Sequence, residues 1–200
     1  MRNYVATYLQ RDVRDIISVR NLSIFKKFLR LCAGRVGQIL NMSNIGNDLG
    51  LSHTTVREWL SALEASYIVY LLPSYYRNFN KRLTKSPKLY FYDVGLASYL
   101  LGLDSYERLE VDPLKGGLFE NFVLMEIVKR FYNNGSNAAV YYFRDSNGQE
   151  VDFLVEHDRK LHLLEVKAGQ TVASDWMKGL KYFQELAKKN VVSSSMMYAG

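Results

Sequence analysis

Two apolar runs on either side of a charged turn most constrain the fold of this chain. The runs are 151–155 (VDFLV) and 161–166 (LHLLEV), and the turn between them is EHDRK. Apolar runs of this length around a short polar turn are typical of a β-hairpin. The sequence therefore predicts two neighbouring antiparallel strands between Gly148 and Gly169.

Three charged residues interrupt these apolar strands. Asp152 lies near the start of the first strand, and Glu165 and Lys167 lie at the end of the second. Because side chains alternate along a strand, Glu165 and Lys167 share one face. A neighbouring strand then brings Asp152 beside Glu165. Two carboxylates and an ammonium group near a strand end predict a site for Mg²⁺ or Mn²⁺ and a phosphate.

Composition excludes several classes of protein. The 200 residues are 48% hydrophobic and 23% charged, as expected of a globular protein with a real core. No apolar run approaches the roughly 18 residues of a membrane span, and no signal core is present. A single cysteine, Cys32, excludes an intramolecular disulfide and a cysteine-rich zinc cluster, and we expect it to be buried. A cytoplasmic location is the default expectation.

Charge is unevenly distributed along the chain. Residues 1–88 contain 14 Lys and Arg against five Asp and Glu, whereas residues 89–200 contain 12 against 15. A basic first half with a mildly acidic second half indicates a polyanion-binding module joined to a module that holds cations. The alternative is an ordinary solvated basic face.

The first half predicts a winged helix. Helices are expected at 4–18 and at 23–33, the latter with Ser23 as its cap, and 43–66 has a helix-turn-helix layout. Strands at 67–72 and 88–92 then form the hairpin of the wing. The second helix of the motif is expected to meet DNA with its leading residues, and the basic loop of the wing is expected to contact phosphates. The predicted DNA-binding residues are Thr54, Thr55, Arg57, Arg77, Lys81, Arg82 and Lys85, with Lys88 beside them. Protein docking without DNA is the alternative.

The second half predicts the element order helix, three strands, helix, strand. Asp93 is expected to cap a short helix that ends before Gly102, and 104–117, with Pro113, Gly116 and Gly117, is expected to be a linker. The predicted domains are thus 1–103, a linker at 104–117, and 118–200. A helix follows from 118, with strands at 139–143 and in the hairpin. A helix beginning at Ser174 or Asp175 and a last strand at 191–198 complete the order.

Glu120 is a fourth residue of interest, because it shares a helical stripe with four apolar residues: Val123, Leu124, Ile127 and Val128. A carboxylate on a buried stripe costs several kcal/mol unless it is paired or bound to a cation.

Glu120 on a helix, Asp152 on a strand, and Glu165-x-Lys167 on the next strand resemble the pattern of the PD-(D/E)xK nuclease superfamily. Val151 stands where that pattern has proline.

The whole chain resembles an uncharacterised domain of unknown function that follows a AAA+ P-loop ATPase in many bacterial and archaeal proteins. The matching stretches include YLQRDV at 8–13, the segment 41–64, NFNKRLTKSPKLYFYDVGLASYLLG at 78–102, GLFENFV at 117–123 and YYFRDSNGQEVDFLVE. The resemblance implies a winged helix followed by a restriction-endonuclease-like αβββαβ domain, of mixed α+β and α/β class. An ATPase module is expected upstream, but no G-x-x-x-x-G-K-[ST] sequence occurs here.

Two functions remain open from the sequence. The first is a DNA-binding deoxyribonuclease that depends on Mg²⁺ or Mn²⁺, with Glu120, Asp152, Glu165 and Lys167 as its catalytic residues and the three carboxylates as metal ligands. The second is a module that docks DNA or a protein without catalysis, in which these residues form a structural network of ion pairs. Either form can act as an oligomer and as an accessory to the ATPase.

Overall fold

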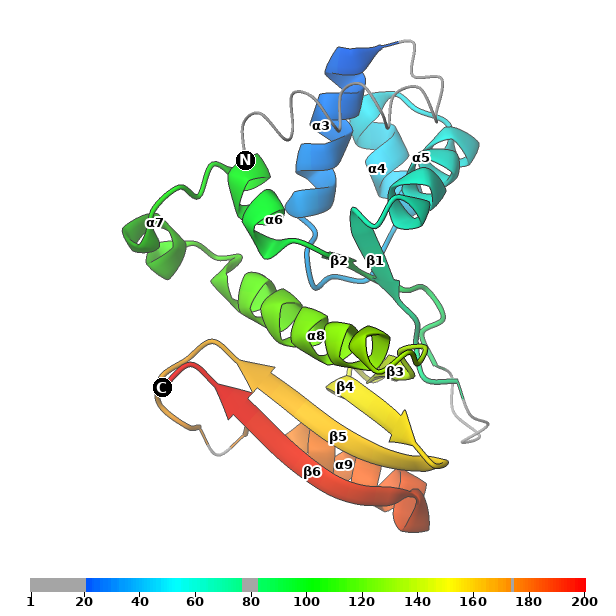
Figure 1. Cartoon of the computed structure of the whole chain (residues 1–200), viewed down its shortest axis with the longest axis vertical. Coiled ribbons are helices and arrows are strands. Elements are labelled where there is room, and N and C mark those ends of the chain that lie inside the picture. The colour runs from blue at the N-terminus through cyan, green and yellow to red at the C-terminus, as the bar shows by residue number, and fades with distance from the viewer. Residues whose placement is uncertain (1–20, 77–82, 174) are drawn as a thin grey trace. The chain divides into compact units, whose positions relative to one another are not determined.

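The computed structural model describes residues 21–76, 83–173 and 175–200 (Figure 1). Within this part of the chain are seven α-helices, a two-stranded sheet and a four-stranded sheet, so the chain is a mixed α and β protein. Its contacts divide it into two compact units. The first unit contains the residues up to Leu71 and Leu89–Leu118, and the second contains Leu72–Lys88 and Phe119–Gly200. The helix predicted at 4–18 lies outside the described residues.

The described part of the first unit begins with three helices, α3 (Leu22–Ala33), α4 (Met42–Leu49) and α5 (His53–Ala65). The side chain of Asn21 accepts hydrogen bonds from the backbone N–H groups of Ser23 and Ile24, so Asn21 caps α3 and the prediction of Ser23 was wrong. Gly50 ends α4 in the left-handed conformation, and Ser52 caps α5. This confirms the two predicted helices and the short turn between them.

A cluster of aromatic rings lies in the core of the first unit. Phe25 and Phe28 of α3 contact Trp59 of α5 edge-on, with ring centroids 5.3 and 5.2 Å apart. Cys32 is fully buried in the same helix, and this burial raises the pKa of its thiol to about 12. The predicted burial of Cys32 is therefore confirmed.

Two short strands and three helices complete the first unit and lead into the second. The strands β1 (Val69–Leu72) and β2 (Lys88–Phe91) pair, and Asp93 caps α6 (Val94–Leu101) as predicted. The predicted linker at 104–117 is not structureless: it contains α7 (Tyr106–Val111) and the start of α8 (Lys115–Asn133). Ser105 caps α7, and Arg108 forms an ion pair with Asp104, so local polar contacts build a helix where turn residues predicted a loop.

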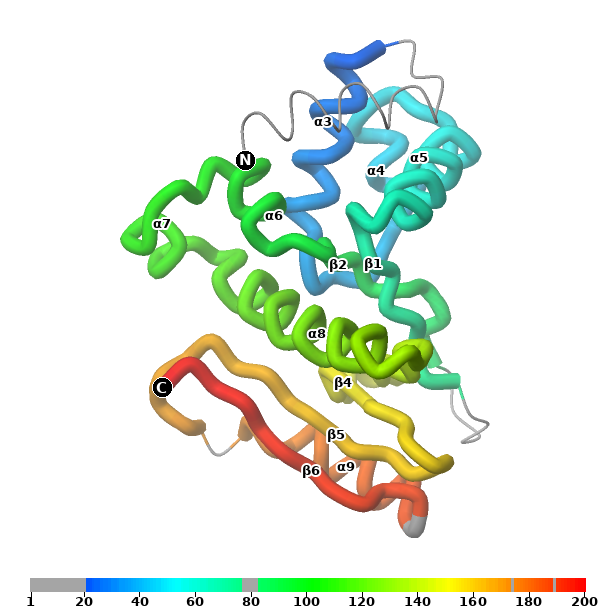
Figure 2. Tube along the Cα trace, in the orientation of Figure 1, coloured from blue at the N-terminus to red at the C-terminus, as the bar shows by residue number. Residues whose placement is uncertain are grey.

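The second unit has the predicted element order. After α8 come β3 (Val140–Arg144), β4 (Glu150–His157), β5 (Lys160–Lys167), α9 (Lys178–Ala187), a 3-10 turn (Lys188–Asn190) and β6 (Val191–Tyr198). The sheet order is β3-β4-β5-β6; β3, β4 and β5 are antiparallel neighbours, and β6 runs parallel to β5. Figure 2 shows β4, β5 and β6 side by side. Asp158 and Arg159 have positive φ and form the tight turn of the predicted β4–β5 hairpin.

The four-stranded sheet packs against α9 through Leu161 and Leu163 of β5 and through Leu180 and Phe183 of the helix. His162 and Leu164 alternate with these residues and line a hollow beside Ile127 and Phe131 of α8. The helices α8 and α9 therefore lie on opposite faces of the four-stranded sheet (Figure 1). The helix α9 begins later than predicted: Met177 precedes it without a side-chain cap, and Ser174 lies outside the described residues.

The described ends of the connection between β1 and β2 pack along β3 within the second unit. Ser74 bridges Tyr142 in parallel, and Leu83 bridges Asp145 in antiparallel fashion. Tyr75 is buried in the core of this unit, with its ring beside those of Tyr141 and Phe183. The described ends of the predicted wing are thus held by a sheet edge.

No helix within the described ranges is long and apolar enough to cross a membrane.

Gly179, in the first turn of α9, gives the fold a sharp test. A Cβ at this position would overlap the backbone oxygen of Glu150, whereas a Cβ at Gly116 would meet nothing within 4 Å. We expect Gly179→Ala to destabilise the protein by about 1–3 kcal/mol, because α9 must move away from β4. Gly116→Ala should be neutral or slightly stabilising. Urea unfolding followed by circular dichroism measures both, and equal stability of the two variants would contradict this packing.

Candidate functional site

The β4–β5 hairpin brings the predicted Asp152 and Glu165 together. Phe153 pairs with Leu164, and Asp152 and Glu165 are the next positions along the two strands. The backbone N–H of Val166 donates a hydrogen bond of 2.8 Å to Asp152 Oδ2. Both carboxylates are 7% exposed. The turn register therefore fixes two buried acids side by side, as the sequence predicted.

Lys167 completes the predicted group at this strand end. Its Nζ lies 2.5 Å from Glu165 Oε1 and 3.9 Å from Asp152 Oδ2. Glu165 and Lys167 are two positions apart on β5, so the alternation of side chains places both on one face. The ammonium of Lys167 thus lies beside both carboxylates.

Glu120 reaches the same cluster from α8, through a residue that the sequence analysis placed elsewhere. Lys88 Nζ lies 3.1 Å from Glu120 Oε1, 2.5 Å from Glu150 Oε1 and 4.0 Å from Asp152 Oδ1. The ammonium also faces the ring of Tyr142, 5.5 Å from its centroid. All four predicted catalytic residues therefore belong to one network of charges, and Lys88 joins Glu120 to it.

The position predicted for Lys88, among the exposed cations of a DNA-binding wing, was wrong. Lys88 is 3% exposed, because the β1–β2 connection runs along β3 and carries it inward. The backbone N–H of Thr84 donates to Arg144 O, and the hydroxyl of Tyr142 donates to Ser86 O. One signal for this burial was present in the sequence: Lys88 directly precedes the apolar run Leu-Tyr-Phe.

Glu150 is a second member that the sequence analysis missed. It lies two positions before Asp152 on β4, and it bridges two cations: Lys88, and Arg144 with a distance of 2.9 Å between Arg144 Nη1 and Glu150 Oε2. Its spacing from Asp152 is the same alternation that relates Glu165 to Lys167. The site is therefore a chain of alternating charges that spans β2, α8, β4 and β5.

Burial and neighbouring charges shift the pKa values of the site. Burial, followed by the charge of Asp152, raises the pKa of Glu165 to about 7. Burial also raises the pKa of Asp152, although Lys88 and Lys167 oppose this shift. For both lysines burial favours the neutral amine, but the surrounding carboxylates outweigh it and raise the pKa of Lys88 and of Lys167. Both ammonium groups therefore remain charged at neutral pH.

One observation bears directly on whether a cation fits here. Glu165 Oε2 is buried and has no hydrogen-bond partner among the described residues. A buried acceptor without a partner costs free energy, and a hard divalent cation binds such an oxygen. Asp152 and Glu165 are thus suitable ligands, whereas Glu120 is already in contact with Lys88. No group of three or more His, Cys, Asp or Glu within the described ranges is arranged to hold a metal ion.

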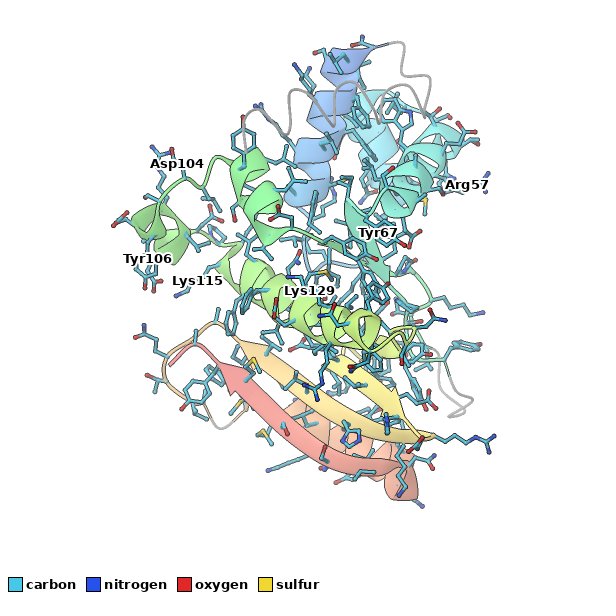
Figure 3. All side chains as sticks on the ribbon, viewed as in Figure 1. Arg57, Tyr67, Asp104, Tyr106, Lys115 and Lys129 are labelled. Carbon is cyan, nitrogen blue, oxygen red and sulfur yellow. The ribbon has the colours of Figure 1, made fainter. Side chains whose placement is uncertain are left out.

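The predicted DNA-binding residues fall into three groups. Thr54 and Arg57 are exposed on α5, and Arg57 extends away from the other helices (Figure 3). The hydroxyl of Thr55 lies 2.9 Å from that of the capping Ser52, and the exposed Lys85 lies over the ring of Tyr76. Arg77, Lys81 and Arg82 lie outside the described residues. Contact of all seven residues with DNA remains a prediction.

Comparison with known proteins identifies the family of the chain. Residues 1–107, more than half of the chain, match the family described as "Domain of unknown function (DUF8612)". The chain belongs to this family. Residues 115–200 match a second family, described as "Domain of unknown function (DUF4143)". The second match covers α8 and the four-stranded sheet, with Glu120, Asp152, Glu165 and Lys167 inside it.

Two mycobacterial relatives align with most of the chain. They are "Uncharacterized protein Rv2008c" of Mycobacterium tuberculosis and "Uncharacterized protein Mb2031c" of Mycobacterium bovis. Each is 30% identical over 168 residues, which is 84% of this chain and 37% of the relative. The chain thus spans little more than a third of the length of these relatives. No solved structure matches the chain significantly.

The raised pKa of Glu165 predicts how stability depends on pH. Between its ordinary value of 4.5 and about 7, the folded state holds a proton that the unfolded state releases. Stability should therefore fall as pH rises through this window, with Asp152 acting in the same direction. In Glu165→Gln the fall in Tm from about pH 5 to about pH 8 should be smaller than in the wild type. The exposed Glu126→Gln serves as control, and equal slopes for wild type and Glu165→Gln would contradict the burial of this acid.

Proposed function

We propose that this chain is a DNA-binding module with a nuclease-like site that depends on a divalent metal and hydrolyses phosphodiester bonds. The observation that carries the proposal is the meeting of Glu120, Asp152, Glu165 and Lys167, which come from one helix and two strands, in a single cluster. Buried acids with raised pKa values beside a specific charge partner are typical of functional sites.

The element order supports a PD-(D/E)xK (restriction-endonuclease-like) fold for the second unit. A helix, three antiparallel strands, a helix and a parallel strand follow each other, and the acids lie on the first helix and on the two central strands. In the first unit, α4, the turn at Leu51 and Ser52, α5 and the β1–β2 pair support a winged helix. Both fold assignments are part of the proposal.

The residues present fit a single divalent cation, Mg²⁺ or Mn²⁺. Asp152, Glu165 and the carbonyl of Val166 would hold it, with Glu165 Oε2 as the oxygen that has no other described partner. The cation, when bound, would activate water and stabilise negative charge on the phosphate. Lys167, charged and beside both acids, would orient the attacking water and stabilise the same negative charge. Glu120 would act directly or through water.

A second function is favoured by Lys88. Its ammonium already compensates Glu120, Glu150 and Asp152, and a raised pKa allows Glu165 to stay neutral below about pH 7. A network that is neutralised from within has no need of a metal. In this alternative the fold is a docking surface for DNA or a protein, and the cluster is structural.

The setting of the module is also proposed. The family of residues 115–200 is consistent with a module that lies beside AAA+ ATPases, so we infer an accessory role next to such an ATPase in the cytoplasm. Oligomerisation would follow that of the ATPase partner.

The decisive experiment is incubation of the protein with branched, single-stranded and duplex DNA in Mg²⁺ or Mn²⁺. We expect cleavage by the wild type and a loss of at least about 100-fold in Glu165→Ala, comparable to or larger than the effect of losing an outer-shell ligand partner. The control is Glu126→Ala, which removes a glutamate from the exposed ion pair with Lys129. This variant should cleave DNA like the wild type. Cleavage that persists in Glu165→Ala would assign the activity to a contaminant.

DNA binding by α5 is tested separately by the dependence of affinity on salt. Arg57→Ala should weaken binding to duplex DNA. The decrease of log K with log salt should become shallower, by about 1 in slope, because one phosphate contact is lost. Lys81→Ala with Arg82→Ala should make this decrease shallower still. Arg108 of α7, which is also exposed and pairs with Asp104, provides the control variant Arg108→Ala. Unchanged binding in the α5 and loop variants would point to a protein partner.

A further inference from the structure

Lys88 occupies a position in the cluster that is surrounded by carboxylates from two elements. Glu120 comes from α8, and Glu150 and Asp152 come from β4, at distances of 3.1, 2.5 and 4.0 Å from Lys88 Nζ. Lys88 itself comes from the first residue of β2 and is 3% exposed. A point charge on a flexible stem therefore sits where three acid side chains converge.

Asp152 divides the cluster into two halves. Its Oδ1 faces Lys88 at 4.0 Å, and its Oδ2 faces Lys167 at 3.9 Å and accepts the hydrogen bond of Val166. On one side Asp152 shares Lys88 with Glu120 and Glu150. On the other side it stands beside Glu165, whose Oε2 lacks a described partner. One carboxylate thus links two places that attract positive charge.

In sites that hydrolyse phosphodiesters with two divalent cations, the cations lie about 3.5–4 Å apart and stabilise the attacking and the leaving oxygens. We propose that the ammonium of Lys88 takes the place of a second divalent cation, so that this chain binds one cation, on the Asp152–Glu165 side. This inference rests on the proposed metal site. It makes Lys88 the residue that sets the number of cations in the cluster.

Charge and geometry both favour exclusion of a second cation by Lys88. The oxygens of Glu120 and Glu150 that would bind it are the same atoms that contact Lys88 Nζ. The other oxygen of Glu150 is taken by Arg144, 2.9 Å away. A divalent cation would therefore have to displace a buried ammonium and approach a second positive group. Removal of the Lys88 charge leaves the three acids without their common partner and open to a metal ion.

The test is the stoichiometry of Mn²⁺ binding to the full chain, measured by titration calorimetry and by the electron paramagnetic resonance signal of free Mn²⁺. We expect one Mn²⁺ in the wild type and in Lys88→Arg, and two in Lys88→Met. Lys115→Met, which breaks the pair between Lys115 and Glu110 outside the cluster, is the matched control and should bind one. Asp152→Ala should bind none.

Lys88→Met leaves three carboxylates without their common positive partner, and this variant can fail to fold. A second variant therefore tests the same inference with a smaller change in net charge. Lys88→Met combined with Glu150→Gln removes one positive and one negative charge and retains Glu120 and Asp152, and it should also bind two Mn²⁺. One Mn²⁺ in both variants would overturn the inference about Lys88 and leave the proposed metal site standing. No Mn²⁺ in the wild type would remove the proposed metal site itself. Failure of both variants to fold even in Mn²⁺ would also overturn the inference, because the cation is expected to replace the ammonium.

Discussion

The second unit depends on the buried ammonium of Lys88 and the three carboxylates around it. A buried charge without a partner is costly, and breaking a buried ion pair by removing one partner typically costs about 3–5 kcal/mol. Here Lys88 comes from β2 and its carboxylate partners come from α8 and β4, so three separate elements meet at these ion pairs. The ammonium of Lys88 therefore couples the position of the start of β2 to the positions of α8 and β4. Hydrophobic burial is not directional, so it does not by itself specify these positions.

The β1–β2 connection gives this coupling a structural basis. Edge strands expose unpaired backbone groups, and proteins cover them or break their regularity. At β3 the flanks of the connection do so: the N–H of Tyr75 donates to Tyr142 O, and the N–H of Tyr142 donates to Pro73 O. The described ends of the connection thus pair with β3 as a partial outer strand, with Tyr75 in the core, and Lys88 follows them in the chain. A loop that appears in the sequence as a free basic wing is, at its described ends, part of the second unit.

Local patterns made much of this architecture predictable. The hairpin follows from two apolar runs around a polar turn, and the cap of α6 follows from Asp93 before an apolar helix. Strand alternation places Glu165 and Lys167 on one face, and the register of the hairpin brings Asp152 beside them. Lys88 could not be predicted in this way, because its burial depends on a contact between segments more than 30 residues apart, such as that with Glu120. The helix α7 was missed for the opposite reason, since its stabilising contacts are local but the turn-forming residues around it dominate the pattern.

The choice between a catalytic and a structural cluster is a question of which groups neutralise the acids. On the Glu120 and Glu150 side, Lys88 and Arg144 already supply the positive charge, and this half resembles a structural network. On the Glu165 side, a single lysine faces two acids, one acid oxygen has no described partner, and burial raises the pKa values of both acids. Among the described carboxylates of the cluster, Glu165 Oε2 is the buried oxygen without a hydrogen-bond partner, so a cation would stabilise this second half. Because Asp152 belongs to both halves, the structural half holds in place a ligand that the other half would use, so the two roles are compatible within one cluster.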